Sequence, residues 1–219
     1  MTPVNIVGMA VVAGLDVIAV TDHNSCKNCR AAMKIGEQYE ILVIPGMELC
    51  TKEEVHVLCL FYRLEDAEQF STYIEKNMPQ IKNKPAFFGN QFIYNEFDEQ
   101  IGIEEVLLMN ALNLSFGEVA EKMKEYHGVM IPAHLDKQSN SLIYQLGFVP
   151  EDASFSCFEL RDFAKLHEYR QRYPYLKQCQ VISNSDAHQL CDINGAVNYL
   201  YVEDNQIEYI LDQLSRKLI

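Results

Sequence analysis

The 219-residue sequence has no tryptophan, no hydrophobic run long enough to cross a membrane and few basic residues. A membrane-spanning helix needs roughly 18 or more apolar residues in a row, and the start of the chain lacks the basic segment of a secretory signal. The 18 Lys and Arg stand against 31 Asp and Glu, which gives a net charge of −13 and no long stripe of phosphate-neutralising side chains. We therefore expect a soluble cytoplasmic protein that binds neither a membrane nor long duplex nucleic acid.

The seven cysteines are an odd number and lack the regular spacing of a secreted disulfide framework. Reduced thiols in a reducing compartment fit this distribution best. The Cys26-Lys27-Asn28-Cys29 segment has the spacing of a redox or zinc motif, but no second cysteine pair accompanies it. We interpret Cys26 and Cys29 as ordinary thiols on the first turn of a helix.

The composition, with 48% hydrophobic and 22% charged residues, is that of an ordinary globular protein, and the length favours a single domain over residues 1–219. Apolar, β-branched runs alternate with segments of helical period, which is typical of an α/β protein with parallel strands. The pattern predicts strands at 17–21, 41–44, 55–61, 129–133, 155–160, 181–184 and 198–202, and helices at 25–39, 65–77, 103–112, 115–126, 162–172 and 206–218.

Three local features refine this pattern. The connection between 41–44 and 55–61 is too short for a parallel crossover, so these two strands are predicted to form a hairpin. Gly128 has the position of a left-handed residue that ends the helix before it. Residues 78–102 are rich in aromatic side chains and have no clear period, which predicts a long loop, an insertion or a lid.

Ionisable side chains gather where the predicted strands end, which is where α/β sheets and barrels carry their sites. A lone histidine at a strand end is more often structural than functional, but here several occur together. Imidazole and carboxylate groups are the ligands of Zn, Mn and Fe sites, so the pattern predicts a site for several metal ions. The residues concerned are Asp22, His23, Glu48, His56, His134, Asp186 and His188.

Three basic residues are candidate contacts for a phosphate group near these strand ends. Lys137 lies three residues after His134 and is the first choice, Arg161 follows the strand at 155–160, and Arg30 lies in the first predicted helix. Each of them also has a simpler interpretation as a solvated surface charge. The remaining histidines, His127 and His167, are predicted to lie in helices and are not assigned to the site.

Four segments, in this order, resemble the polymerase-and-histidinol-phosphatase (PHP) domain family of metal-dependent phosphoesterases. They are Gly-Leu-Asp-Val-Ile-Ala-Val-Thr-Asp-His-Asn at 14–24, Pro-Gly-Met-Glu at 45–48 with Val-His at 55–56, Pro-Ala-His at 132–134 and Ser-Asp-Ala-His at 185–188. The resemblance covers nearly the whole chain. It implies a distorted (βα)7 TIM-like barrel that holds two or three divalent ions (Zn, Mn or Fe) at the carboxyl ends of its strands.

The resemblance also implies a role for each site residue. Glu48 resembles a carboxylate that bridges metal ions, and His56 and His134 resemble the imidazoles that complete one metal position with it. Asp186 resembles a ligand of a second ion, and His23 with His188 resembles part of a third position. Asp22 is expected to orient neighbouring groups rather than to bind metal. The implied reaction is hydrolysis of a phosphoester by water that the metal ions activate.

The sequence departs from the family at one place. Family members begin with a strand that carries Asp-Leu-His-x-His, whereas residues 1–5 of this chain resemble the helix that follows that strand. The second and third metal positions would then be short of ligands, and a barrel without its first strand would have two open edges. From this departure we expect the sequence to begin downstream of its natural start.

These observations predict a phosphoesterase that acts on a phosphomonoester or a short nucleotide. Three alternatives remain open: a binding module that keeps the fold but not the activity, an exonuclease acting on 5′-phosphorylated ends, and an amidohydrolase-type metal barrel. The last typically relies on a carbamylated lysine or a different histidine spacing, which the sequence does not show. The sequence does not determine the oligomeric state.

Overall fold

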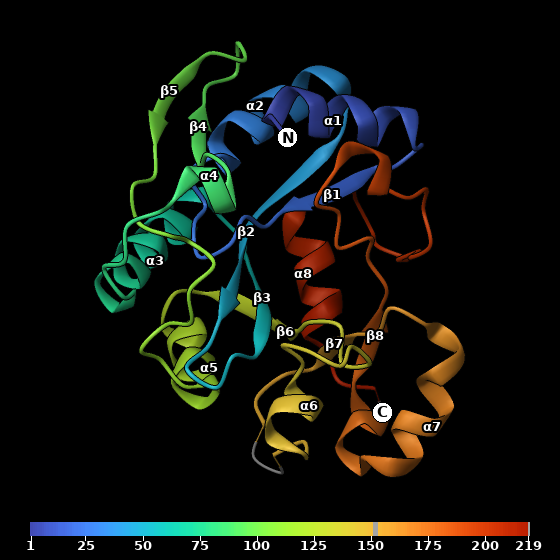
Figure 1. Ribbon diagram of the computed structural model, residues 1–219. Coiled ribbons are helices and arrows are strands. Elements are labelled where there is room, and N and C mark those ends of the chain that lie inside the picture. Colours follow the sequence, from blue (N-terminus) through green and yellow to red (C-terminus); the bar gives the residue numbers. More distant parts are fainter. Residues whose placement is uncertain (151–152, 219) are drawn as a thin grey trace.

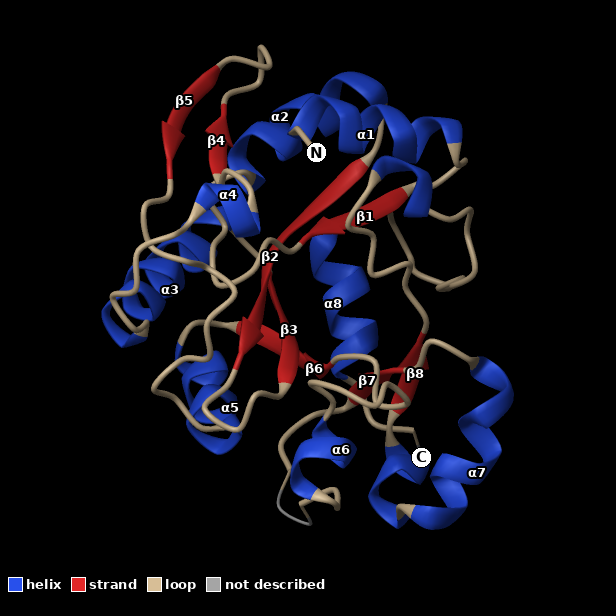
Figure 2. Ribbon diagram, viewed as in Figure 1, coloured by secondary structure: helices blue, strands red, loops and turns tan. Residues whose placement is uncertain are grey.

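The computed structural model describes residues 1–150 and 153–218 of the chain, and the strands in this part form three small sheets (Figures 1 and 2). The four-stranded sheet has the order β1-β2-β3-β6, and the pairs β4-β5 and β7-β8 form two further sheets. The strands are β1 (Val17–Val20), β2 (Leu42–Cys50), β3 (His56–Phe61), β4 (Phe92–Tyr94), β5 (Gln100–Ile103), β6 (Gly128–Pro132), β7 (Cys157–Glu159) and β8 (Gln180–Ile182).

The four-stranded sheet mixes parallel and antiparallel pairs. β1 runs parallel to β2, whereas β3 is antiparallel to both β2 and β6, so the predicted hairpin of β2 and β3 is confirmed. β2 and β3 approach closely at Gly46, where an added Cβ would lie 2.8 Å from the backbone oxygen of Cys59. The predicted α/β class is confirmed. A TIM-like barrel is not, because none of the sheets in the described residues closes on itself.

Helices cover the sheets and supply most of the remaining core. α8 lies beside β8 in Figure 1 and buries Ile210, Leu211 and Leu214 against Ile131 of β6 and Cys157 of β7. The α-helices are α1 (Pro3–Val12), α2 (Cys29–Tyr39), α3 (Leu64–Asn77), α4 (Pro85–Phe88), α5 (Phe116–Glu125), α6 (Leu142–Leu146), α7 (Leu166–Arg172) and α8 (Ile207–Ser215). None of the helices in the described residues is long and apolar enough to span a membrane.

α2 shows how the sequence produces both a helix and its packing. Ala31, Ala32 and Ile35 recur at helical spacing and are buried, while the charged Arg30, Lys34 and Glu37 are exposed. The helix ends at Glu40, which takes a left-handed conformation with φ of 57°. An added Cβ on Gly36 would lie 2.5 Å from the backbone oxygen of Ile41, so only glycine lets α2 pack this closely on the chain that leads into β2.

The helix predicted at 103–112 is wrong. β5 ends at Ile103, and side-chain amides hold the following residues in an irregular conformation. The Gln91 amide nitrogen donates to the backbone oxygens of Glu104 and Val106, and its oxygen accepts the Leu108 N–H. These bonds satisfy backbone groups that a helix would otherwise have paired internally.

Two smaller predictions are also wrong. Residues 198–202 are not a strand, and the Asn198 side chain instead pairs with the backbone of Ser183, donating to its oxygen at 2.7 Å and accepting its N–H at 2.9 Å. Gly128 does not cap α5 in a left-handed conformation. His127 has the positive φ, at 51°, and Gly128 is the first residue of β6.

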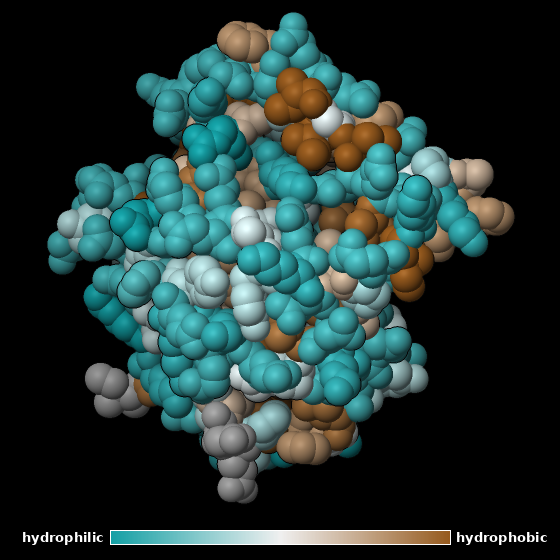
Figure 3. Space-filling view, turned by 90° about the vertical axis from the view of Figure 1, so that its left-hand side faces the viewer, coloured by the Kyte–Doolittle hydropathy of each residue, from teal (hydrophilic) through white to brown (hydrophobic). Residues whose placement is uncertain are grey.

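Residues 78–102 contain α4 and most of a β4-β5 hairpin that stands beside α2 (Figure 1). Lys34 of α2 forms an ion pair with Glu96 at 2.6 Å, and the side chain of Asn28 bonds to the backbone of β4. Figure 3 looks at this side of the molecule and shows apolar groups gathered in its upper half within a mostly hydrophilic surface. That these residues act as a lid stays a prediction.

Candidate metal centre

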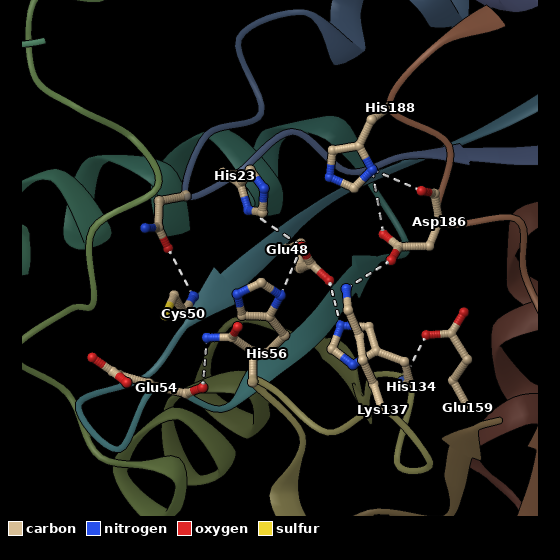
Figure 4. A network of polar contacts seen from close by, with 12 residues as sticks. His23, Glu48, Cys50, Glu54, His56, His134, Lys137, Glu159, Asp186 and His188 are labelled. Atoms are coloured by element: carbon tan, nitrogen blue, oxygen red, sulfur yellow. Dashed lines mark hydrogen bonds and ion pairs between the residues drawn. The ribbon is translucent and has the colours of Figure 1, made fainter. Parts of the chain in front are cut away.

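Four chain segments bring the predicted site residues together (Figure 4). Because β3 is antiparallel to β2, its first residue lies opposite Cys50 at the carboxyl end of β2, which explains an imidazole at the start of an apolar strand. An isolated parallel bridge between His23 and Glu48 extends the pairing of β1 and β2 into the site. The segments are the end of β1 with Asp22 and His23, the β2-β3 hairpin with Glu48 and His56, the end of β6 with His134, and the segment after β8 with Asp186 and His188.

The carboxylate of Glu48 lies between three imidazoles. Its Oε2 atom is 3.2 Å from Nδ1 of His23 and 3.2 Å from Nδ1 of His56. Its other oxygen, Oε1, faces Nε2 of His134 at 3.6 Å. Glu48 is only 6% exposed, so this charge is held inside the protein. Each carboxylate oxygen therefore faces a different imidazole environment, as the proposed bridging role requires.

Several nitrogen atoms in this cluster are buried without a hydrogen-bond partner in the described residues. They are Nδ1 of His23, which is close to Glu48 but not aligned for a hydrogen bond, and both ring nitrogens of His134. Buried polar atoms are almost always paired, so unpaired imidazole nitrogens beside a carboxylate are suited to binding a metal ion. Single ligand atoms of His23, Glu48 and His56 lie within 4.8 Å of one another. This donor set fits a divalent transition metal.

The electrostatics of the cluster favour the protonation states that bind metal. Burial lowers the pKa of His23, and this outweighs the attraction of the Glu48 carboxylate, so the neutral imidazole is favoured. Burial alone would raise the pKa of Glu48, but its contacts with His134 and His56 and the nearby His23 together hold that pKa well below its usual range. Metal ligands must be deprotonated, which is the state that both shifts promote.

Asp186, His188 and Lys137 form the outer side of the site. Asp186 has a left-handed backbone with φ of 48°, and its carboxylate accepts a hydrogen bond from Nζ of Lys137 at 3.3 Å. Nδ1 of His188 lies 2.8 Å from the backbone oxygen of Asp186, and its ring is 6.1 Å from the ring of His23, centroid to centroid. The His188 side chain is 63% exposed, which leaves this side of the cluster open to solvent.

The other predicted residues take different places. Asp22 accepts a hydrogen bond from the Asn28 amide at 2.9 Å, but burial has the larger effect and raises its pKa. Arg161 is exposed and bonds through its backbone N–H to Asp136 at 2.8 Å; in the described part of the chain its guanidinium forms no ion pair. Arg30 is a surface charge paired with Glu68 at 2.7 Å.

Glu159, the last residue of β7, lies beside the site but is not among the residues predicted from the sequence. Its carboxylate is 3% exposed and accepts the backbone N–H of His134 at 2.9 Å, and burial raises its pKa. Most of the predicted site residues follow a strand, whereas Glu159 lies within the apolar run Cys-Phe-Glu-Leu at 157–160. A single carboxylate at the carboxyl end of an otherwise apolar strand was the signal that could have identified it.

Six of the cysteines are buried, and their surroundings indicate a structural role. Cys26 and Cys29 were both predicted on the first turn of a helix, but only Cys29 is, as the first residue of α2, and Cys26 lies three residues before it. Both are buried, and burial raises the pKa of Cys26 to about 11 and that of Cys29 well above its usual value. Burial also raises the pKa of Cys50 and of Cys179 to about 11. Thiols with such pKa values stay protonated near neutral pH and react slowly. Six of the seven cysteines are buried, and Cys191 is exposed.

We therefore expect one fast-reacting thiol in the native protein. A thiol reagent such as 5,5′-dithiobis(2-nitrobenzoic acid) should modify Cys191 first, because it alone of the seven is exposed. The measurement is the number of thiols modified in the burst phase, compared with the total in denaturant. The Cys191→Ser variant is the control and should lack the burst, and a native burst from Cys26 or Cys29 would contradict their buried placement.

Searches of family models and of curated proteins found no match to the chain. Solved structures do match. A lesion-specific endonuclease from Pyrococcus furiosus, Endonuclease Q, aligns with 98% of this chain and 51% of its own, at 19% identity and a TM-score of 0.66. A complex of Endonuclease Q with a 27-mer duplex that carries an abasic lesion aligns with 100% of this chain and 53% of its own, at 19% identity and a TM-score of 0.60.

A protein described as a metal-dependent phosphoesterase, from Bifidobacterium adolescentis, aligns with 96% of this chain and 90% of its own. The identity is 15% and the TM-score is 0.58. The resemblance to the PHP family that the four sequence segments predicted is thus confirmed for the fold. The chain spans about half the length of the Endonuclease Q structures, one of which is a complex with a 27-mer duplex. The comparisons therefore do not bear out the expectation that long duplex nucleic acid is excluded.

Proposed function

We propose that the chain is a metal-dependent phosphoesterase that hydrolyses a phosphomonoester or a short nucleotide. The observation that supports this most directly is the buried Glu48 carboxylate between the imidazoles of His23, His56 and His134, three of whose six ring nitrogens are buried without a hydrogen-bond partner in the described residues. The likeness of the fold to a protein described as a metal-dependent phosphoesterase agrees with it. The seven free cysteines agree with a reducing compartment, and we propose the cytoplasm.

In this proposal Glu48, His56 and His134 hold one divalent ion, and His23, Asp186 and His188 contribute to further positions. Zn, Mn and Fe all suit these ligands. Bound divalent ions supply Lewis acidity and lower the pKa of a coordinated water. Lys137, beside Asp186, is placed to contact a phosphoryl oxygen, and Asp22 orients its neighbours through Asn28. Arg161 remains a weaker candidate for the phosphate, because its side chain is exposed and no contact with the other site residues is seen in the described part of the chain.

We also propose that residues 1–219 form one domain in which the sheets are parts of a distorted, open barrel of the PHP type. β6 and β7 belong to different sheets, but the Leu135 N–H donates to the backbone oxygen of Glu159 at 2.9 Å just beyond their ends. α8 packs against residues of both strands, so the two sheets share one hydrophobic core cluster.

A second candidate is a nuclease that acts on DNA ends or lesions. The fold comparison favours it, because one matching structure is an endonuclease in complex with a 27-mer duplex. The net charge of −13 opposes it, because binding a long duplex depends on neutralising its phosphates. Measuring hydrolysis of a phosphomonoester and of a DNA duplex by the same protein therefore distinguishes the two candidates.

Replacing His134 by Ala tests the proposed activity. Hydrolysis of p-nitrophenyl phosphate and of a 5′-mononucleotide by the metal-loaded protein should fall by on the order of 100-fold or more, since a lost ligand removes several kcal/mol of charge stabilisation. The matched control is His167→Ala, because His167 lies on α7 and pairs only with Gln171 in the described residues. A wild-type protein that hydrolyses no phosphoester with Zn, Mn or Fe would contradict the proposal and favour a binding module.

A further inference from the structure

His134 has a backbone conformation that needs support from its surroundings. Its φ is 33°, in the left-handed region that residues other than glycine rarely adopt. Such residues persist where neighbouring contacts hold them, and they are common at functional sites. The contacts that hold His134 in this conformation therefore also decide where its ring lies.

The ring itself supplies no such contact. Both nitrogens of His134 are buried without a hydrogen-bond partner in the described residues, and Nε2 is 3.6 Å from the Glu48 carboxylate. With no hydrogen bond on the ring, the backbone and the packing around the side chain, which is 1% exposed, determine its direction. The backbone at His134 is thus the part that must be fixed before a metal ion binds.

Two of the hydrogen bonds that fix this backbone come from Glu159. Its side-chain Oε2 accepts the His134 N–H at 2.9 Å, and its backbone oxygen accepts the Leu135 N–H at 2.9 Å. A third bond, from the Lys137 N–H to the His134 oxygen at 2.9 Å, closes the turn from the other side. Of these, only the first depends on a side chain, so it is the one that a substitution can remove.

Among the described residues, the Glu159 side chain has one hydrogen-bond partner, the backbone N–H of His134. It forms no ion pair with a Lys or Arg there, and the nearby carboxylates of Glu48 and Asp186 disfavour its charged form, whereas His134 favours it. A carboxylate buried without a cation is costly unless it makes hydrogen bonds. The bond to the His134 N–H is the compensating contact that the structure shows.

We propose that Glu159 is a positioning residue: its side chain accepts the His134 N–H, holds the left-handed turn and so directs the His134 ring toward Glu48. The part of this inference that concerns metal affinity rests on the proposed metal site, whereas the part that concerns the turn does not. Glu159 is not itself a metal ligand in this proposal.

The experiment compares Glu159→Ala and Glu159→Gln with the wild type by two measurements. Titration with Co²⁺, followed by its visible absorption, should show about 10- to 100-fold weaker binding for Glu159→Ala, as is common when a partner that orients a ligand is lost. Hydrogen exchange of the His134 amide in the metal-free protein, measured by NMR, should lose protection in the same variant. Glu159→Gln keeps an oxygen acceptor, so its Co²⁺ affinity and its protection of the His134 amide should both lie within a few-fold of the wild-type values.

Glu53→Ala is the matched control. Glu53 also accepts a backbone N–H with its carboxylate, that of Phe116 at 3.0 Å, but this bond lies at the start of α5 and does not involve a candidate metal ligand. The Glu53→Ala variant should have a lower free energy of unfolding and an unchanged Co²⁺ affinity. Glu159→Met, which keeps the volume but has no oxygen, replaces the Ala variant if the latter does not fold, with the same expected losses.

Unchanged Co²⁺ affinity and unchanged His134 protection in Glu159→Ala would overturn the inference, as would a Gln variant that behaves like the Ala variant. If the wild type binds no Co²⁺, the proposed metal site is wrong, and the exchange measurement alone decides whether Glu159 holds the turn. The two failures are therefore distinguishable.

Discussion

Replacing Glu48 by Gln should abolish metal binding at the candidate centre and reduce phosphoester hydrolysis by on the order of 10³-fold, equivalent to about 4 kcal/mol. Gln keeps the size of the side chain but removes the negative charge that faces His23, His56 and His134. Because both carboxylate oxygens face imidazoles, one substitution affects every metal position that shares Glu48. The measurements are metal content per chain, by inductively coupled plasma mass spectrometry, and the turnover of a phosphomonoester.

Asp66→Asn is the matched control for this variant. Asp66 and Glu48 are both 6% exposed, but the Asp66 carboxylate binds the Arg63 guanidinium near the start of α3 and takes no part in the site. The control protein should keep its metal content and its activity, with a lower free energy of unfolding. A Glu48→Gln protein that retained the wild-type metal content would show that the metal binds elsewhere.

Metal binding should weaken by roughly 100-fold when the pH is lowered from about 7.5 to about 5.5, since each imidazole ligand that takes up a proton costs up to about tenfold per pH unit below its pKa. The lowered pKa of Glu48 keeps this carboxylate ionised throughout the range, so acidification acts through the imidazoles. Burial lowers the pKa of His23, so this imidazole keeps its neutral form to lower pH than a free imidazole does. Zn²⁺ titrations at several pH values measure the effect.

The rise in melting temperature caused by excess Zn²⁺ should shrink over the same pH range, because a ligand stabilises the folded state only as far as it binds there. His167→Ala should show the same pH profile as the wild type. A loss of affinity centred near pH 4 would assign the metal to carboxylates alone and contradict the imidazole ligands.

The strand ends and the hairpin were predictable because they depend on local chemistry. Apolar runs followed by Asp, His or Glu place ionisable groups at one edge of a sheet whatever the details of packing, and the short connection before His56 excludes a parallel crossover. The sequence could not show that the two oxygens of Glu48 face different imidazoles. That arrangement depends on the register between Cys50 and His56 and on the turn at His134.

Two of the errors, the helix at 103–112 and the strand at 198–202, share one physical cause. Residues 103–112 have helical spacing, but the side chains of Gln91 and Asn24, which are distant in the sequence, form hydrogen bonds with their backbone. The Asn24 amide donates to the backbone oxygen of Leu108 at 2.6 Å and to that of Asn110 at 2.9 Å. Residues 198–202 have strand composition, but a strand also needs a neighbour with which to pair, and the Asn198 side chain bonds to Ser183 instead. Side-chain amides that reach across the fold leave no periodic signal in a sequence.

The amide of Asn28 ties the β4-β5 hairpin to the site. Its nitrogen donates to Asp22 at 2.9 Å and to the backbone oxygen of Phe92 at 3.3 Å, and its oxygen accepts the Tyr94 N–H at 3.0 Å. Shortening or exchanging the hairpin in an engineered protein would remove the bonds of Asn28 to Phe92 and Tyr94. The same amide donates to Asp22, which precedes His23 in the chain. A redesign of this region should therefore keep residues 92–94 together with Asn28, because a change there would disturb Asp22 and its neighbour His23, a candidate metal ligand.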